Sequence, residues 1–152
     1  MRALIQRVKQ ASVAIDGSVH VRIGRGLLIF LGVAGIDDSE AAHYLARRCA
    51  SLRIFEDEAG KMNLSVKDVE GNALVISQFT LYADTRKGNR PNFIEAAPPE
   101  VAEKLYDEFV TRLKFELGDS KVGTGIFRAM MDISLINDGP VTVMVESKND
   151  AH

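Results

Sequence analysis

The chain has 152 residues, of which 46% are hydrophobic and 26% are charged, so it can bury the core of one compact domain. Its net charge of −2 and its pI near 5.9 argue against a protein that coats nucleic acids by bulk electrostatics. The single cysteine excludes an internal disulfide, and the longest apolar stretch, residues 27–36, is about half of the roughly 20 residues that a membrane-spanning helix needs. We therefore expect one cytoplasmic domain over residues 1–152, with a polar tail from about residue 147 and no membrane segment.

The first part of the chain alternates apolar and polar residues, a pattern typical of strands that bury one face. It predicts strands over residues 4–9, 12–15 and 19–23, with Asp16-Gly17 as a hairpin signal between the second and the third. Residues 27–33 are continuously apolar and predict a central strand that is buried on both faces.

A helix follows, with Asp37 as its predicted cap and Glu40 at the third helical position. The apolar stripe of this helix is expected to contain Ala42, Leu45, Cys49 and Leu52. Because Cys49 lies in the stripe, we interpret it as a core residue rather than a reactive thiol.

The second half combines strands with one more helix. Strand-like residues 53–56 and 62–66 flank a turn, and residues 73–82 predict a long strand in which Leu74, Ile76, Gln78 and Thr80 share a face. Pro98 and Pro99 open a helix whose expected stripe is Val101, Leu105, Phe109 and Leu113, and Gly118 ends it. Strands over residues 130–136 and 141–145 follow, separated by a Gly-Pro turn.

The fold class that these elements predict is α+β: a largely antiparallel sheet or open barrel with two main helices packed on it.

Two short segments place hydrogen-bonding groups among apolar strands. Ser77, Gln78 and Thr80 follow the apolar run 73–76, and a packed strand tolerates such groups only if they find partners or a ligand. Gly139-Pro140 interrupts the last strand pattern, and proline cannot donate to a sheet ladder. Together the segments predict a pocket that binds through backbone and neutral polar groups.

Familiar hydrolytic machinery is missing from the sequence. It has no Gly-x-Ser-x-Gly elbow, no His-Glu-x-x-His zinc site and no phosphate-binding glycine loop that ends in Lys-Ser or Lys-Thr. We therefore expect no metal and no cofactor. An enzyme with this sequence would work by positioning its substrate and by hydrogen bonds to developing charge.

Several segments resemble the D-aminoacyl-tRNA deacylase family, in family order and over nearly the whole chain. The specific motifs are Ser77-Gln78-Phe79-Thr80 and the segment 137–142 around Gly139-Pro140, and residues 1–8, 53–57 and 61–65 also match. The chain departs from the family at Arg128, where a small residue is usual; the extra bulk either narrows the pocket rim or adds a phosphate contact.

The resemblance implies a homodimer that hydrolyses the ester between a D-amino acid and the terminal ribose of tRNA. It implies a catalytic segment of Ser77, Gln78, Phe79 and Thr80, and a substrate-binding and chiral-selection set of Gly139, Pro140, Arg7 and Met131. In relatives the Gly-Pro bond is cis and enters the active site of the other subunit. Such a rigid stretch of backbone could exclude an L side chain, and a pocket of this kind would also accept glycine. From the residues alone, an ordinary hairpin turn is the alternative.

Two mechanisms stay open for the ester cleavage. Either Thr80 attacks the carbonyl carbon, or the segment of Thr80, Phe79 and Ser77 donates hydrogen bonds to the carbonyl oxygen while the ribose 2′-hydroxyl helps to activate water. We favour the second, because the sequence offers no base near Thr80. Arg7 could brace the Gly-Pro segment or form a surface salt bridge, and Gln78 could orient the adenosine or satisfy neighbouring backbone.

The basic loop of Arg86, Lys87 and Arg90 is the candidate tRNA contact, with a solvated loop as the alternative interpretation. A non-catalytic nucleic-acid-binding module that uses this loop is the alternative function. The acidic pI and the absence of aromatic residues along a basic strand weaken it.

Overall fold

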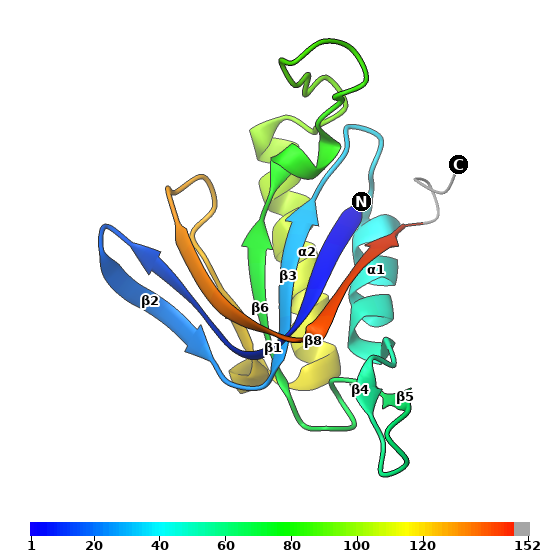
Figure 1. The fold of residues 1–152 in the computed structure, drawn as a ribbon. Helices are drawn as coiled ribbons and strands as arrows, with labels where there is room; N and C mark the ends of the chain where they lie inside the picture. The colour runs from blue at the N-terminus through cyan, green and yellow to red at the C-terminus, as the bar shows by residue number, and fades with distance from the viewer. Residues whose placement is uncertain (148–152) are drawn as a thin grey trace.

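Two helices cover one face of a curved sheet in the computed structural model, which describes residues 1–147 (Figure 1). The strands are β1 (Arg2–Ile15), β2 (Ser18–Ile23), β3 (Gly26–Gly32), β4 (Phe55–Glu56), β5 (Met62–Leu64), β6 (Asn72–Ser77), β7 (Val122–Thr124) and β8 (Asp132–Glu146). The helices are α1 (Ser39–Ser51) and α2 (Pro99–Leu117), with the short 3-10 helices η1 (Phe79–Tyr82) and η2 (Asp119–Lys121).

Strand β1 organises the sheet. The predicted strands 4–9 and 12–15 form one continuous strand, whose first half pairs with β3 and whose second half pairs with β2, while β8 runs antiparallel along most of its length. The predicted hairpin between β1 and β2 is confirmed: Asp16 and Gly17 have φ values of 52° and 79°, which a tight hairpin turn requires.

The middle of the sheet is parallel. Strand β3 is buried along most of its length, as predicted, and it pairs in parallel with β6, which pairs in parallel with β7. The expectation of a largely antiparallel sheet is therefore correct for the pairings of β1 but not for the pairing of β3 with β6 or of β6 with β7. Strand β7 was not predicted, because a strand of three residues carries too little alternation to detect.

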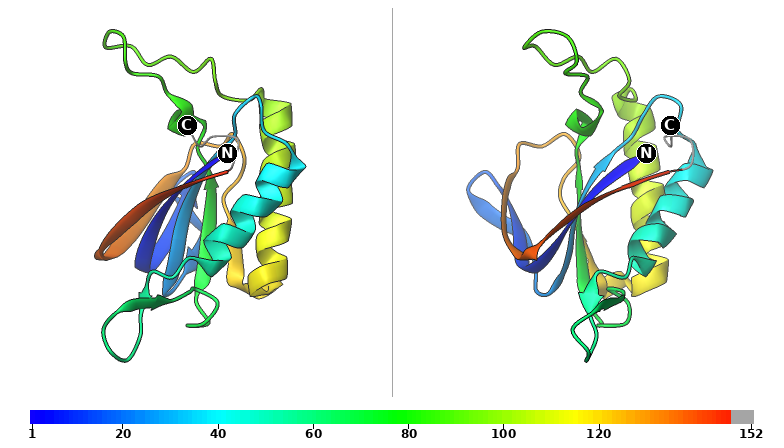
Figure 2. Two further views of the ribbon diagram at one scale, coloured as in Figure 1. Left: turned by 90° about the vertical axis from the view of Figure 1, so that its right-hand side faces the viewer. Right: turned by 45° about the vertical axis from the view of Figure 1, so that its right-hand side comes forward.

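The sheet packs on both of its faces. One core fills the space between the sheet and the helices, and Figure 2 shows this two-layer arrangement from the side. A second core lies inside the curve of the sheet and contains Val8, Val13, Leu28 and Leu74, among others. A Cβ atom on Gly123 of β7 would lie 2.5 Å from Val21 of β2, so the two ends of the sheet approach closely and the barrel is nearly closed.

The structure corrects three details of the helices. Asp38, and not Asp37, caps α1, because its carboxylate accepts from the Ala41 backbone N–H, and Glu40 is therefore not at the third position. Leu52 lies at the C-terminal cap of α1, outside the helical stripe. Val101 is 40% exposed, and α2 buries Ala102 and Tyr106 beside the predicted Leu105, Phe109 and Leu113.

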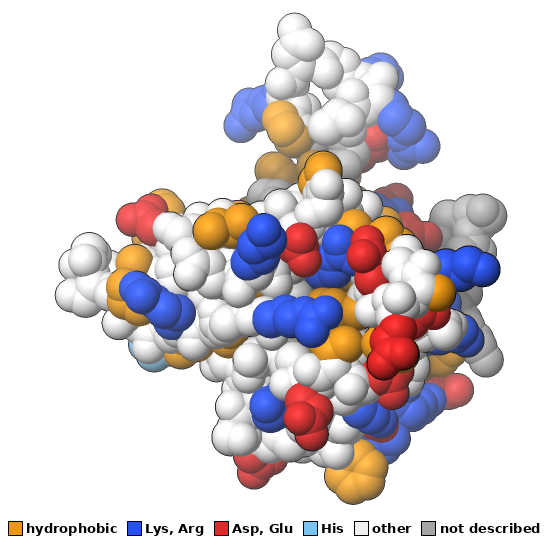
Figure 3. Space-filling view, turned by 60° about the horizontal axis from the view of Figure 1, so that its bottom comes forward, with side chains coloured by type: hydrophobic (Ala, Val, Ile, Leu, Met, Phe, Trp, Pro, Cys, Tyr) orange, Lys and Arg blue, Asp and Glu red, His pale blue; other side chains and the backbone are white. Residues whose placement is uncertain are grey.

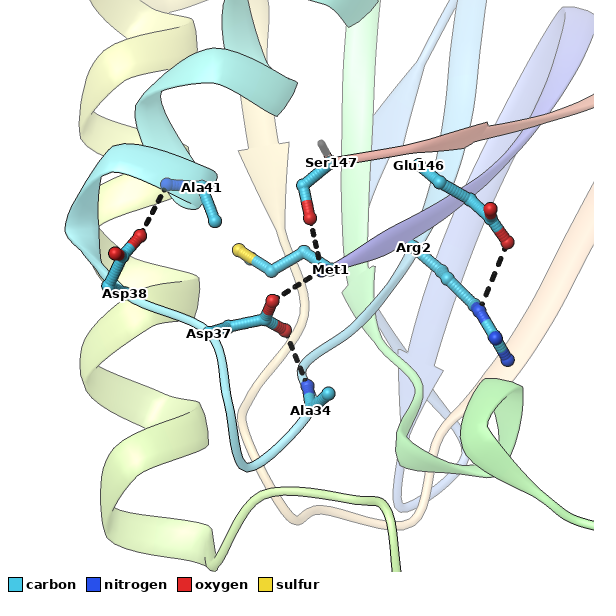
Figure 4. Close-up of polar contacts among 8 residues, drawn as sticks. All are labelled: Met1, Arg2, Ala34, Asp37, Asp38, Ala41, Glu146 and Ser147. Atoms are coloured by element: carbon cyan, nitrogen blue, oxygen red, sulfur yellow. Dashed lines mark hydrogen bonds and ion pairs between the residues drawn. The ribbon is translucent and has the colours of Figure 1, made fainter. Parts of the chain in front are cut away.

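Asp37 instead builds a buried polar corner at the N-terminus. The Met1 ammonium donates to Asp37 Oδ1 at 2.7 Å and to Ser147 Oγ at 2.6 Å, and the Ala34 N–H donates to Asp37 Oδ2 (Figure 4). Met1 and Ser147 are almost fully buried, and the Ser147 N–H donates to the Met1 carbonyl. Ser147 therefore belongs to the fold, and the rest of the polar tail expected from residue 147 lies outside the described residues.

The charged surface is mixed. On the face shown in Figure 3, lysine and arginine side chains are interspersed with aspartate and glutamate rather than gathered into one patch. Within residues 1–147, no helix has the length and apolar character that crossing a membrane requires.

Candidate active site

The end of β6 forms the centre of the candidate site. The predicted strand over residues 73–82 ends at Ser77; Gln78 has φ −147° and ψ 83°, and η1 begins at Phe79. The Gln78 N–H still donates to the Leu31 carbonyl on β3, at 2.8 Å. The expectation that Gln78 and Thr80 share a strand face is therefore wrong, because the chain turns out of the sheet between them.

Close packing against β3 fixes η1 in place. A Cβ atom on Gly32 would lie 3.1 Å from the Gln78 carbonyl oxygen and 3.2 Å from the Tyr82 ring, so only a residue without a side chain fits well beneath η1. Arg2 holds the other end, because its Nη1 donates to the Leu81 carbonyl and its guanidinium lies 4.5 Å from the centre of the Tyr82 ring. Arg2 also pairs with Glu146 of β8 at 3.2 Å.

A pocket of about 640 Å³ opens beside this segment. Its walls come from the ends of β3 and β6, from η1, from residues 93–97 and the first half of α2, and from residues 127–133, which lead into β8. The lining residues are Leu31, Val33, Ile76, Ser77, Gln78, Phe79, Phe93, Ala96, Ala97, Pro99, Ala102, Tyr106, Phe127, Arg128, Ala129, Met130, Met131 and Ile133. Arg128 is the one charged residue in this set, so the pocket is suited to neutral parts of a ligand.

The structure brings most of the predicted catalytic segment to the pocket. Ser77, Gln78 and Phe79 line it, as does Met131 from the opposite wall. Thr80 is exposed and is not among the lining residues; its hydroxyl accepts a short hydrogen bond from the Gln78 side-chain amide. At the start of η1, the Phe79 and Thr80 N–H groups have no acceptor within that helix, which leaves two backbone donors beside the pocket-lining segment 77–79.

The Gly139-Pro140 segment is not a turn between two paired strands. Both halves of β8 pair with β1, and the residues between Asn137 and Thr142 leave the ladder opposite Arg7. The Gly139-Pro140 peptide bond is cis, and both residues are exposed. Neither lines the pocket of the described chain.

Arg7 contacts the base of this projecting segment. It is 6% exposed; its Nε donates to the Asp138 carbonyl at 3.1 Å, and its Nη1 donates to the Ile54 carbonyl at 2.7 Å. The Asp138 carboxylate lies 3.4 Å from the same Nε. Gly139 has a φ of 127°, and a Cβ atom there would lie 3.0 Å from the Arg7 guanidinium, so glycine is required both for conformation and for space.

The basic loop projects away from the body of the molecule (Figures 1 and 2). Backbone hydrogen bonds between Asp84 and Asn92 close its base. The Arg86 guanidinium donates through two nitrogens to the Asp84 carboxylate, which holds the pKa of Asp84 well below its usual range. The Arg86 guanidinium is therefore already paired with Asp84, whereas Lys87 and Arg90 are exposed and form no ion pair within residues 1–147.

The pocket lining contains hydrogen-bonding groups but no side chain that would act as a general base near neutral pH. Tyr106 donates its hydroxyl to the Val75 carbonyl at 2.7 Å, and burial raises the pKa of this phenol well above its usual range. Among residues 1–147, no three histidine, cysteine, aspartate or glutamate side chains gather in a group that could hold a metal ion. The arrangement can position an ester and stabilise charge on its carbonyl oxygen.

Sequence reasoning missed the wall formed by Tyr106 and Phe127. These rings lie 6.0 Å apart and close the pocket on the side of α2. The available signal was Tyr106, which carries a polar group on the buried face of α2 and therefore needs a partner or a ligand.

Comparisons with known proteins agree on one family. The family model described as D-Tyr-tRNA(Tyr) deacylase matches residues 4–146. A D-aminoacyl-tRNA deacylase from Desulfatibacillum aliphaticivorans is 57% identical over 97% of this chain and 100% of its own length. The enzyme of the same name from Thermomicrobium roseum is also 57% identical, over 97% of this chain and 94% of its own.

The fold has a solved counterpart as well. The structure of a c-Myc DNA unwinding element binding protein superimposes with a TM-score of 0.93 and 40% identity, over 97% of this chain and 99% of that one.

Proposed function

The chain belongs to the D-Tyr-tRNA(Tyr) deacylase family, and from this membership and the site we propose that it hydrolyses the ester between a D-amino acid and the terminal ribose of tRNA. The observation that carries the proposal is the pocket at the end of β6, which is lined by Ser77, Gln78 and Phe79 and is uncharged except for Arg128. The products of this hydrolysis are the free amino acid and a reusable tRNA. The reaction takes place in the cytoplasm, where aminoacyl-tRNAs are made and used.

The chemistry depends on hydrogen bonds to the carbonyl oxygen of the ester. The Phe79 and Thr80 N–H groups at the start of η1 stabilise the negative charge that develops there, and the ribose 2′-hydroxyl helps to activate water. Aminoacyl esters are labile, so a barrier reduction on the order of 5–8 kcal/mol is sufficient. The Thr80 hydroxyl accepts a hydrogen bond from the Gln78 amide, and the lining residues of the pocket include no histidine or carboxylate that could serve as its base, which argues against Thr80 as the nucleophile.

Chiral selection comes from a second copy of the chain. Gly139 and Pro140 project from the sheet, are exposed, and lie outside the pocket of their own chain. Buried Arg7 fixes the base of the projection, so it can enter a partner's pocket as a rigid stretch of backbone. Backbone in that position excludes an L side chain and leaves a D side chain free to point outward. Glycine has no side chain to exclude, so glycyl-tRNA is a substrate too.

The decisive experiment is deacylation of D-tyrosyl-tRNA, L-tyrosyl-tRNA and glycyl-tRNA by the purified full chain. We expect hydrolysis of the D-tyrosyl and glycyl esters and none of the L-tyrosyl ester. Equal rates on the two tyrosyl esters would refute chiral selection. A tRNA that ends in 2′-deoxyadenosine tests the mechanism: full activity on it, combined with complete loss in Thr80→Ala, would make Thr80 the nucleophile.

Mixed dimers test the shared site. Phe79→Ala damages the pocket, and Pro140→Ala damages the projecting segment. A mixed dimer contains one site with both parts intact, so co-expression of the two variants should recover hydrolysis of the D-tyrosyl ester with rejection of the L-tyrosyl ester, a combination that neither variant should show alone. Failure of any mixture to recover would contradict the exchange of Gly139-Pro140 between subunits.

A nucleic-acid-binding module without catalysis is the second candidate. It is favoured by the 40% identity to a protein that binds a DNA unwinding element and by the projecting loop with exposed Lys87 and Arg90. The deacylation assay separates the two, since a binding module retains RNA without releasing amino acid.

A further inference from the structure

Arg128 differs from the residues around it in the pocket. Of the lining residues it alone is charged, and its side chain is exposed at the rim. Within residues 1–147 its guanidinium takes part in no hydrogen bond, ion pair or ring contact. By comparison, Arg2, Arg7, Arg86 and Arg112 all have carboxylate partners.

The backbone at Arg128 is unfavourable for arginine. The Ala129 N–H donates to the Ile126 carbonyl at 3.1 Å, which makes residues 126–129 a hydrogen-bonded turn, and Arg128 occupies its third position with a φ of 68°. Turns with positive φ at that position ordinarily contain glycine or asparagine there. A conformational cost at a ligand-facing position points to a role for the side chain.

The loop that carries Arg128 is fixed to the pocket wall. The Gly125 N–H donates to the Val75 carbonyl on β6, and Phe127 packs against Tyr106 on α2. A Cβ atom on Gly125 would lie 2.5 Å from the Met131 sulfur, so the two ends of the loop are in close contact. Arg128 therefore presents its guanidinium from an anchored turn at the pocket rim.

From these observations we propose that Arg128 binds the phosphate that joins the terminal adenosine of the tRNA to the preceding nucleotide. The inference rests on the proposed function. Apart from Arg128 the pocket lining is uncharged, which suits the adenosine. The first anion beyond the adenosine, present in every aminoacyl-tRNA, is this phosphodiester. A guanidinium matches its geometry through two parallel hydrogen bonds. Lys87 and Arg90 then remain for phosphates farther along the RNA.

The test compares two substrates, D-tyrosyl-tRNA and the D-tyrosyl ester of adenosine, which lacks the phosphate. For Arg128→Gln, the ratio of kcat/KM on the tRNA to kcat/KM on the adenosine ester should fall about tenfold, through KM. The dependence of log kcat/KM for the tRNA on log salt concentration should become shallower by roughly 0.7. Arg128→Lys should restore part of the ratio, and Arg47→Gln, an exposed arginine of α1 outside the pocket, should leave it unchanged.

A second variant, Arg128→Gly, separates loss of binding from loss of folding. Glycine adopts the positive φ without strain, so this variant should unfold at the same temperature as the unmodified protein or higher, while the ratio of kcat/KM on the tRNA to kcat/KM on the adenosine ester should fall as in Arg128→Gln. An unchanged ratio in both variants would overturn the proposal. So would a loss confined to D-aspartyl-tRNA, since Arg128 would then bind an acidic side chain. If the unmodified protein hydrolyses neither ester, the proposed function itself fails; if it hydrolyses both and the ratio does not respond, only the role of Arg128 fails.

Discussion

Two regions of the molecule differ in the burial and pairing of their side chains. One is the N-terminal corner, formed by Met1, Asp37 and Ser147, and the other is the pocket mouth, formed by Phe79, Arg128 and Met130. At the corner every charge is buried and paired within the chain. At the mouth, Phe79 is 57% exposed, Met130 is 90% exposed and Arg128 has no partner in the part of the chain that the structure describes. A buried charge destabilises the fold strongly if it loses its partner, whereas exposed apolar groups and an exposed cation are typical of a surface that binds another molecule.

Breaking the corner should have the largest effect on stability. Asp37→Ala removes the carboxylate that accepts from the Met1 ammonium and from the Ala34 N–H, so the buried ammonium loses this anionic partner. We expect a loss of about 3–5 kcal/mol in the free energy of unfolding, measured by urea denaturation. A loss below that of Asp38→Ala would show that the corner is not a stabilising cluster.

At the pocket mouth we expect a substitution to lower activity strongly and stability only slightly. Phe79→Ala should lower kcat/KM for D-tyrosyl-tRNA at least tenfold, about 1.4 kcal/mol, because Phe79 lines the pocket and begins η1. Its free energy of unfolding should change by no more than about 0.5 kcal/mol, since the ring is mostly exposed. Phe55→Ala is the matched control: that ring is 1% exposed, and its removal should cost about 3–5 kcal/mol. Similar unfolding curves for the two variants would contradict the comparison.

The helix cap beside the corner should have a smaller effect. Asp38→Ala removes the acceptor for the Ala41 N–H at the start of α1, at a cost of about 1 kcal/mol. Asp38→Asn keeps an acceptor oxygen and should recover most of the loss. Urea denaturation of the three proteins side by side measures both differences.

The smallest effect concerns Cys49 and appears only at alkaline pH. Burial raises the pKa of this thiol to about 12, so the folded chain keeps it protonated where the unfolded chain, with a thiol pKa of about 8.5, ionises it. Stability from this group is complete below about pH 8.5 and is lost as the pH rises toward 12. Urea denaturation between pH 7 and 10 should show a decline that is less steep in Cys49→Ala, and at pH 8 the folded protein should resist thiol reagents that label the unfolded chain.

Sequence patterns located the strands and helices well where one periodicity governed many residues. The alternation in β1 and β2 and the apolar run of β3 were read correctly, because burial of one or both faces dictates those patterns. The cap of α1 was misassigned because Asp37 and Asp38 are chemically alike. Only the tertiary contact with the Met1 ammonium distinguishes them.

The candidate site could be predicted in part. Ser77, Gln78 and Thr80 stood out as polar residues beyond an apolar run, and the first two line the pocket whereas Thr80 does not. Phe79, which also lines the pocket, was expected only from the family resemblance. The end of β6 at Ser77 could not be predicted, since it depends on η1 packing against Gly32, which is distant in sequence. For the same reason Tyr106 was assigned to no site: its pocket exists only after α2 docks on the sheet.

The excursion in β8 allows the projecting Gly139-Pro140 segment to vary independently of the fold. Two steps along β1, from Gln6 to Val8, are matched by five steps along β8, from Asn137 to Thr142, so three surplus residues form the projection. Asn137 ties its two ends together through hydrogen bonds to the Thr142 hydroxyl and from the Val141 N–H. An insertion or deletion within this stretch would alter the reach of the projection while the hydrogen-bonded ladders on either side kept their alignment.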